Sequence, residues 1–159
     1  MNTDEVLGVI SDTHGLIRSD VITAFAGVSG IVHAGDVGED HVLHTLAALA
    51  PVTAVKGNMD RHHQASLLET VACLEWAGLR IAVVHDLSTL PPWDPAGERV
   101  DVVVFGHSHR AEITWRNGLL YFNPGSAGPR RFGRPATVGL LTVDATGRPR
   151  PQVIQLHGD

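Results

Sequence analysis

The side chains best suited to bind metal ions in this sequence each follow a short apolar run. Asp12 and His14 come after one run, and His107 and His109 come after another with the same spacing. If each pair continues its strand, side chains two positions apart point to the same face. Imidazole and carboxylate groups on one face could bind a divalent metal ion. The candidate ligands are Asp12, His14, Asp36, Asn58, His85, His107 and His109.

Each candidate ligand also has an ordinary structural explanation when it is taken alone. Asp12 could cap the start of a helix, and Asp36 and Asn58 each follow a glycine, where turn residues are common. All seven, however, lie where an apolar run ends. Because ligands gather at the carboxyl ends of strands in open α/β sheets, these side chains are expected to meet at one edge of the fold.

The elements that would carry these residues alternate between strand-like and helical runs in the first third of the chain. The order is a strand at Val6–Ile10, a helix at Asp20–Ala26, a strand at Gly30–His33, a helix at Glu39–Leu49 and a strand at Val52–Val55. This βαβαβ pattern predicts parallel strands.

The remainder of the chain predicts further strands joined by tight turns. Leu79–His85 and Val102–Phe105 are apolar runs typical of buried strands. Asn117-Gly118 and Ala77-Gly78 favour hairpins, and Asp144–Pro149 is expected to join Thr137–Val143 to Gln152–Leu156. We therefore expect a mixed α/β fold, with parallel crossovers first and antiparallel hairpins later, in a single domain spanning residues 1–159.

The ordered series of these residues resembles the calcineurin-like metallophosphoesterases. The matching motifs are Asp12-x-His14, Gly35-Asp36, Gly57-Asn58-x-Asp60, His85 and Gly106-His107-x-His109. The short chain and Asn123-Pro124-Gly125-Ser126 are similar to the family's small single-domain phosphodiesterase branch, which includes the vacuolar protein sorting 29 scaffold. The resemblance implies two facing mixed β-sheets flanked by helices.

The resemblance also implies a role for each ligand. One metal would be held by Asp12, His14, Asp36 and His109, and the other by Asp36, Asn58, His85 and His107, with Asp36 bridging. Such donors suit two divalent transition-metal ions, manganese first, with iron, zinc or nickel as alternatives. The implied reaction is hydrolysis of a phosphate ester, expected to be a diester, by in-line attack of a hydroxide that bridges the metals. Arg130 or Arg131 could stabilise charge on the phosphate.

Two positions depart from the family pattern. Many relatives carry a histidine at the position of Met59, which would help to protonate the leaving group, and methionine cannot do so. His62 or His63, which lie close in sequence, could replace it or could be surface residues. Asp86 stands where the branch usually has glycine, and we expect it to cap the following turn.

Composition narrows the partners and the location. With a formal net charge of −5 and Lys56 as its single lysine, the chain is not expected to bind nucleic acid, and a small phosphodiester is the expected substrate. The acidic N-terminus and the lack of a long apolar stretch predict a cytoplasmic protein without a membrane span. Cys73 is expected to be a buried, inert thiol. Nothing in the sequence indicates an oligomeric state.

Two other classes of function deserve comparison. His-x-His pairs also occur in amidohydrolases and metallo-β-lactamase-like hydrolases, but the former need a barrel of roughly 250 residues. The latter resemble His-x-His-x-Asp-His, whereas Arg110, Ala111 and Glu112 follow His109 here.

The main alternative is a non-catalytic interaction scaffold of the same fold, for which an exposed Trp93 beside Pro91-Pro92 would be an anchor. That family scaffold has a degraded metal site, whereas every ligand position is filled here.

Overall fold

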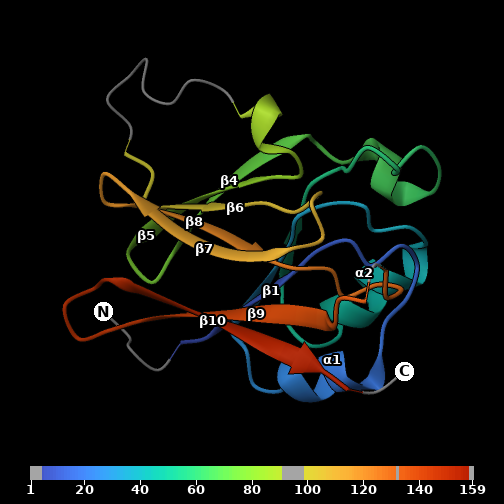
Figure 1. Ribbon diagram of the computed structural model, residues 1–159, viewed down its shortest axis with the longest axis horizontal. Helices are drawn as coiled ribbons and strands as arrows, with labels where there is room; N and C mark the ends of the chain where they lie inside the picture. Colours follow the sequence, from blue (N-terminus) through green and yellow to red (C-terminus); the bar gives the residue numbers. More distant parts are fainter. Residues whose placement is uncertain (1–4, 91–98, 132, 158–159) are drawn as a thin grey trace.

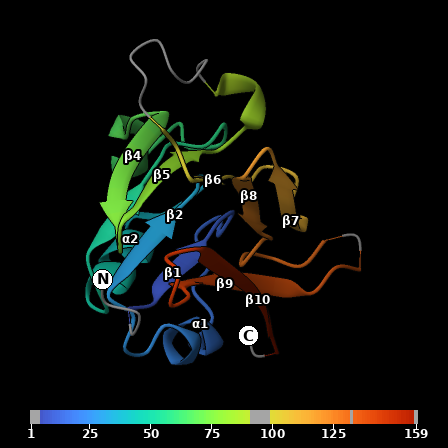
Figure 2. The ribbon, with the colours of Figure 1, turned by 90° about the vertical axis from the view of Figure 1, so that its left-hand side faces the viewer.

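Two five-stranded β-sheets form this protein in the computed structural model, which describes residues 5–90, 99–131 and 133–157. The first sheet has the strand order β10-β9-β1-β2-β3, and the second has the order β4-β5-β6-β8-β7. Figures 1 and 2 show the two sheets facing each other, with helix α1 on the side of the first sheet away from the second. The expected pair of facing mixed sheets is confirmed.

The first sheet contains the predicted βαβαβ unit. Strands β1 (Leu7–Ile10), β2 (Gly30–His33) and β3 (Val52–Ala54) pair in parallel. Helices α1 (Ser19–Ala24) and α2 (Asp40–Ala47) connect them and are shorter than expected. Their buried side chains pack with Ile10 and Ile31 on the sheet face away from the second sheet.

The C-terminal hairpin completes this first sheet. Strand β9 (Ala136–Val143) pairs antiparallel with β1 on one side and with β10 (Pro149–Leu156) on the other. The sheet is therefore mixed, and the predicted hairpin around residues 144–149 is confirmed.

The second sheet combines two hairpins with parallel strands. Strand β4 (Val71–Trp76) pairs antiparallel with β5 (Leu79–Val84), and β7 (Ala111–Arg116) pairs antiparallel with β8 (Leu119–Pro124), as the glycine-containing turns predict. Strand β6 (Val102–Val104) lies between β5 and β8 and is parallel to both. Parallel pairing therefore continues into the second half, where only antiparallel hairpins were expected. Two short 3-10 helices, η1 (Gln64–Leu67) and η2 (Leu87–Thr89), lie in the connections.

The main core lies between the sheets. Leu7 and Val9 of β1 pack there against apolar side chains of the second sheet, such as Ile81 and Phe122. Alternate residues of each strand point into this layer because successive side chains leave opposite faces. Both faces of the first sheet are covered by apolar side chains, and this packing fixes the positions of its strand ends.

Cys73 is exposed, so the expectation of a buried thiol is wrong. It lies in β4, an edge strand whose side chains alternate between partly buried Ala72, Leu74 and Trp76 and exposed Cys73 and Glu75. The run from Val71 to Leu74 reads as continuously apolar because cysteine is classed as apolar, although Cys73 lies on the solvent-facing side of the strand. Pro91, Pro92 and Trp93 lie outside the described residues. None of the helices in the described ranges is long and apolar enough to cross a membrane.

Candidate metal centre

All seven candidate ligands lie just beyond the carboxyl ends of strands. Asp12 and His14 follow β1, Asp36 follows β2, Asn58 follows β3, His85 follows β5, and His107 and His109 follow β6. Parallel pairing of β2 with β1 and with β3, and of β5 with β6, places these ends side by side within each sheet. The two sheets meet at this edge, where Asp12 of the first lies 3.2 Å from His109 of the second.

The backbone directs most of these side chains inward in the loops that follow the strands, and not within the strands themselves. Five of the seven have positive φ angles between 46° and 72°: Asp12, His14, Asp36, His107 and His109. The explanation from strand alternation is therefore wrong for both His-containing pairs. Left-handed backbone is uncommon for residues with a side chain and concentrates at functional sites. The rest of the fold holds these loops in place.

Two glycines allow the loops to approach each other. Gly35 has φ +100°, and a β-carbon there would lie 2.7 Å from His85 Nδ1. A β-carbon on Gly57 would overlap the backbone nitrogen and the Oδ1 atom of Asp36. The expected sharp turn at Gly35 is confirmed, whereas Gly57 is needed for the close packing of the β2 and β3 loops.

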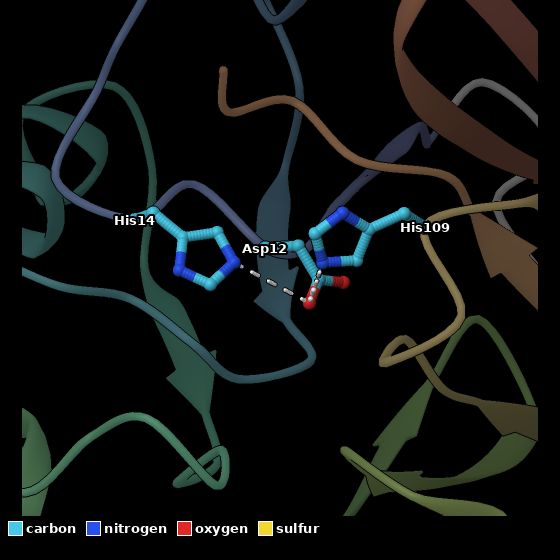
Figure 3. A group of neighbouring side chains, drawn as sticks. All are labelled: Asp12, His14 and His109. Carbon is cyan, nitrogen blue, oxygen red and sulfur yellow. Dashed lines mark ion pairs between the residues drawn. The ribbon is translucent and has the colours of Figure 1, made fainter. Parts of the chain in front are cut away.

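Asp12, His14 and His109 form one group of potential ligands, with both rings directed at the Asp12 carboxylate (Figure 3). Their ligand atoms lie within 4.8 Å of one another. Asp12 Oδ1 is 3.2 Å from His109 Nε2 and 4.0 Å from His14 Nε2. The other oxygen of Asp12 accepts hydrogen bonds from Ser11 Oγ and from the backbone N–H of His107.

A second group contains Asp12, Asp36 and His85. Asp36 Oδ2 lies 3.3 Å from His85 Nε2 and 3.7 Å from His14 Nε2, so this oxygen faces both groups. Asn58 Oδ1 lies 2.9 Å from His85 Nε2 and 3.2 Å from His107 Nδ1. The half-exposed His107 ring therefore joins the site through Asn58.

The buried acceptor atoms of this site fit a cation. Asp12 Oδ1 and His14 Nε2 are buried and form no hydrogen bond. Burial lowers the pKa of His14, although Asp36 and Asp12 oppose that shift, so the neutral ring with its lone pair is favoured. Buried polar atoms without a hydrogen bond are costly, and a divalent cation bound by both atoms would remove that cost.

His85 supports the same conclusion for the second group. The Ala34 carbonyl can only accept, so the 2.8 Å contact with His85 Nδ1 requires a proton on Nδ1. Nε2 of the neutral ring then directs a lone pair at two oxygen atoms. Burial lowers the pKa of His85, but Asp36 and Asp12 outweigh it and raise the pKa above its ordinary value. A proton on Nε2 and a metal ion would therefore compete for the same lone pair.

Two buried residues to which the sequence assigned no ligand role hold the loops. His33 Nδ1 accepts from Gly35 N–H, and His33 Nε2 lies 3.0 Å from Thr13 Oγ1, which donates to the Val37 carbonyl. Asp60 accepts hydrogen bonds from the backbone N–H groups of Val37, Gly38 and Gly57. Asp60 was part of the recognised motif but had no role, and no periodicity in the sequence marks either residue as buried.

The candidate phosphate-binding arginines differ in their hydrogen bonds. Arg130 Nη2 donates to the His157 carbonyl at 3.4 Å, and Arg134 Nη1 donates to the Ser108 carbonyl at 3.2 Å. Arg130 and Arg131 both line a cavity that also contains His109. Both arginines therefore lie beside the candidate metal centre.

The remaining positions near the site are exposed. Met59 is 56% exposed, and its backbone N–H donates to Asp36 Oδ1. His62 makes no hydrogen bond or ion pair with the described residues. Asp86 caps η2 by accepting from Ser88 N–H, as predicted, and its Oδ2 lies 3.9 Å from His107 Nε2.

Comparisons with known proteins agree with this architecture. A family model described as the calcineurin-like phosphoesterase superfamily domain matches residues 6–146. A probable metallophosphoesterase of Methanothermobacter thermautotrophicus is 34% identical over 87% of this chain and 86% of its own length. Phosphodiesterase YfcE of Escherichia coli K12 is 33% identical over 58% of this chain and 53% of its own. Vps29 of Chaetomium thermophilum has the same fold, with a TM-score of 0.72 at 21% identity over 96% of this chain and 97% of that one.

Proposed function

Because this chain belongs to the calcineurin-like phosphoesterase superfamily, we propose that it is a metal-dependent phosphodiesterase acting on small phosphodiesters. The observation that carries the proposal is that Asp12 Oδ1 and His14 Nε2, two buried polar atoms without a hydrogen bond, lie 4.0 Å apart beyond the strand ends. These atoms fit a cation, and the second group of ligands lies against them.

The proposed centre contains two divalent transition-metal ions, with manganese as the first choice and iron, zinc or nickel as alternatives. Asp12, His14, Asp36 and His109 would hold one, and Asp36, Asn58, His85 and His107 would hold the other. When bound, the ions would supply an activated water for in-line attack at phosphorus and would neutralise charge on the phosphate. Asp36 Oδ2 faces both groups, which supports a bridging role.

The chain itself would contribute binding and positioning. Arg130 or Arg131, which line a cavity with His109, would bind a non-bridging oxygen of the phosphate. The side chain of Met59 has no proton to give to a leaving group. Esters of acidic alcohols, which leave without protonation, should therefore react fastest. The choice of a diester substrate rests on the name of the YfcE relative.

The proposal is tested by hydrolysis of bis(p-nitrophenyl) phosphate after the protein has been stripped of metal with a chelator. We expect no activity without metal and activity after addition of manganese. His109→Gln should lower kcat/KM by at least ~100-fold, since it removes a ligand that lies against Asp12 Oδ1.

The matched control is His41→Gln. His41 is exposed on α2 and pairs with Glu39 at 3.3 Å, outside the site, so this variant should keep full activity. A reconstituted wild type no more active than His109→Gln would refute a metal-dependent phosphodiesterase.

A non-catalytic scaffold is the second candidate, favoured by the shared fold with Vps29. The two candidates differ in what the metal site is for. A scaffold would bind metal with the same ligands and show no turnover, so metal binding measured by calorimetry, together with the absence of hydrolysis, would select it.

A further inference from the structure

A cavity of about 350 Å³ opens directly beside the metal centre. Two of its lining residues, Asn58 and His85, are proposed ligands, so a group in this cavity would adjoin a substrate phosphate. The volume lies in the range typical of sites for small organic ligands, roughly 300–1,000 Å³. The lining residues are Lys56, Gly57, Asn58, Arg61, Thr70, His85, Asp86 and Thr89.

Lys56 is the only lysine of the chain, and it is half-buried in this cavity wall. It lies two residues before Asn58, and its backbone N–H donates to the Glu69 carbonyl at 2.9 Å, which fixes the segment. Neither Lys56 nor Arg61 forms an ion pair with any residue in the described part of the chain. An anionic ligand in the cavity would provide the counter-ion that these two side chains lack among the described residues.

The other charges around the cavity do not neutralise these two cations. Among the lining residues that the structure describes, Asp86 alone is acidic, and its carboxylate accepts from Ser88 N–H at 3.0 Å and faces His107 at 3.9 Å. The side of the cavity formed by Lys56 and Arg61 is therefore positively charged, although the chain as a whole carries a net charge of −5.

A larger cavity at the β4–β5 turn provides a contrast. Its volume is about 520 Å³, and its charged lining residues pair with one another. Arg80 lies 3.9 Å from Glu75, and Arg99 lies 3.3 Å from Asp101. The cavity beside the metal centre differs from this one, because it combines two proposed ligands with two cations that have no carboxylate partner among the described residues.

We propose that this cavity binds a second phosphate group, carried by an alcohol part of the phosphodiester that the metal centre hydrolyses. Lys56 and Arg61 would bind this second phosphate through charge-assisted hydrogen bonds. The substrate class would then be phosphodiesters that carry an additional terminal phosphate. This inference rests on the proposed function and specifies the substrate of the same site.

Two chromogenic diesters that differ only in the additional phosphate test this proposal. They are thymidine 5′-(p-nitrophenyl phosphate) and its 3′-phosphorylated form. We expect the manganese-loaded wild type to prefer the 3′-phosphorylated ester by at least ~10-fold in kcat/KM. The preference should fall to near unity in Lys56→Met, which keeps the aliphatic stem, and should persist in Lys56→Arg.

The control for a general change of charge is Arg99→Met, which removes one positive charge at the β4–β5 cavity and should retain the preference. Arg61→Met, at an exposed position, should also reduce the preference and serves as a second variant if Lys56→Met does not fold. A wild type that hydrolyses both esters equally would overturn the subsite while leaving the phosphodiesterase intact.

Binding to the metal-stripped protein provides a readout without turnover. Calorimetry should show that thymidine 3′,5′-bisphosphate binds at least ~10-fold more tightly than thymidine 5′-monophosphate. Lys56→Met should abolish the difference. If neither ester is hydrolysed but this difference in binding depends on Lys56, the catalytic function fails and the anion site stands. Equal binding of both nucleotides contradicts the anion site.

Discussion

At the scale of single residues, the candidate ligands use one atom for anchoring and offer another to the centre. Asp12 Oδ2 accepts from Ser11 and His107, while Oδ1 forms no hydrogen bond. Asp36 Oδ1 accepts from Met59 N–H, while Oδ2 faces two rings. His85 is held through Nδ1 by the Ala34 carbonyl and directs Nε2 inward. This division fixes ligand orientation before any metal binds.

A substitution at Met59 should change how strongly the hydrolysis rate depends on the acidity of the departing alcohol. Its side chain is exposed, so a histidine could be accommodated there, and its backbone contact with Asp36 would persist. Met59→His should supply a proton to the departing alcohol, which matters most when that alcohol is weakly acidic. We expect kcat for a phenyl phosphodiester to rise by at least ~10-fold and kcat for the p-nitrophenyl analogue to change little.

Met59→Leu is the matched control, since it keeps an apolar side chain without a titratable group. The ratio of kcat between the two esters is the quantity to compare across wild type and both variants. A uniform change on both esters, or the same ratio in Met59→His and Met59→Leu, would argue against proton donation from this position.

The identities of the candidate ligands were readable from the sequence, but the reason for their convergence was not. Asp12 and His14 point toward the same site because both have left-handed backbone in the loop after β1, with φ angles of 58° and 46°. Such φ angles are imposed by the packing of neighbouring loops and leave no periodic signal. His33 was also out of reach, because a histidine at a strand end reads the same whether it faces solvent or lies buried.

At the scale of elements, Asp60 joins the loop after β2 to the loop after β3. Its carboxylate accepts from Val37 and Gly38 on the first loop and from Gly57 on its own. These loops carry the proposed ligands Asp36 and Asn58. The geometry of the centre therefore depends on a residue that need not touch the metal.

Asp60→Asn should separate the two loops, because an amide nitrogen would face a backbone N–H where an oxygen now accepts. We expect unfolding to become easier by about 1–3 kcal/mol and manganese affinity to fall by ~10–100-fold. Denaturant titration gives the free energy of unfolding, and calorimetry gives the affinity.

Asp144→Asn is the comparison for this loop anchor. Asp144 Oδ1 also accepts backbone N–H groups, from Thr146 and Arg148, but in the β9–β10 turn away from the centre. Its substitution should lower thermal stability without weakening manganese binding. An equal loss of affinity in both variants would mean that Asp60 acts only through global stability.

The arrangement of elements was largely predictable because strand alternation with helices dictates a parallel sheet. Parallel strands in turn placed Asp12, Asp36 and Asn58 at one edge. The insertion of β6 between β5 and β8 was not predictable, since it depends on long-range pairing rather than on the turns that join neighbouring strands. The exposed face of β4 was missed for the same reason, because edge position is a property of the assembled sheet.

At the scale of the whole molecule, His33 couples folding to pH. The ring is fully buried, and its two nitrogens are used by Gly35 and Thr13. Since Gly35 N–H donates to Nδ1, the network requires the neutral ring with its proton on Nε2. Burial lowers the pKa of His33 from 6.5 to about 4.

The metal-stripped protein should therefore lose stability between pH 6.5 and pH 4. In this window the unfolded chain protonates His33 and the folded chain does not, so the unfolded state binds more protons and acid favours it. Each pKa unit corresponds to 1.36 kcal/mol, and we expect the free energy of unfolding to fall by about 3 kcal/mol. The lowered pKa values of Asp12 and Asp36 act below this window, and the raised pKa of His85 acts above it. The lowered pKa of His14 acts within the window and in the same direction as that of His33.

His33→Gln isolates this contribution, because it removes the titrating ring and leaves the other acidic and basic groups in place. Denaturant titrations at several pH values should show a slope smaller by nearly one proton between pH 4 and pH 6.5. His41 is exposed and lies outside this network, so His41→Gln should retain the wild-type slope. If wild type and His33→Gln lose stability in parallel as the pH falls, His33 is protonated in the folded state as readily as in the unfolded state, and its network cannot require the neutral ring.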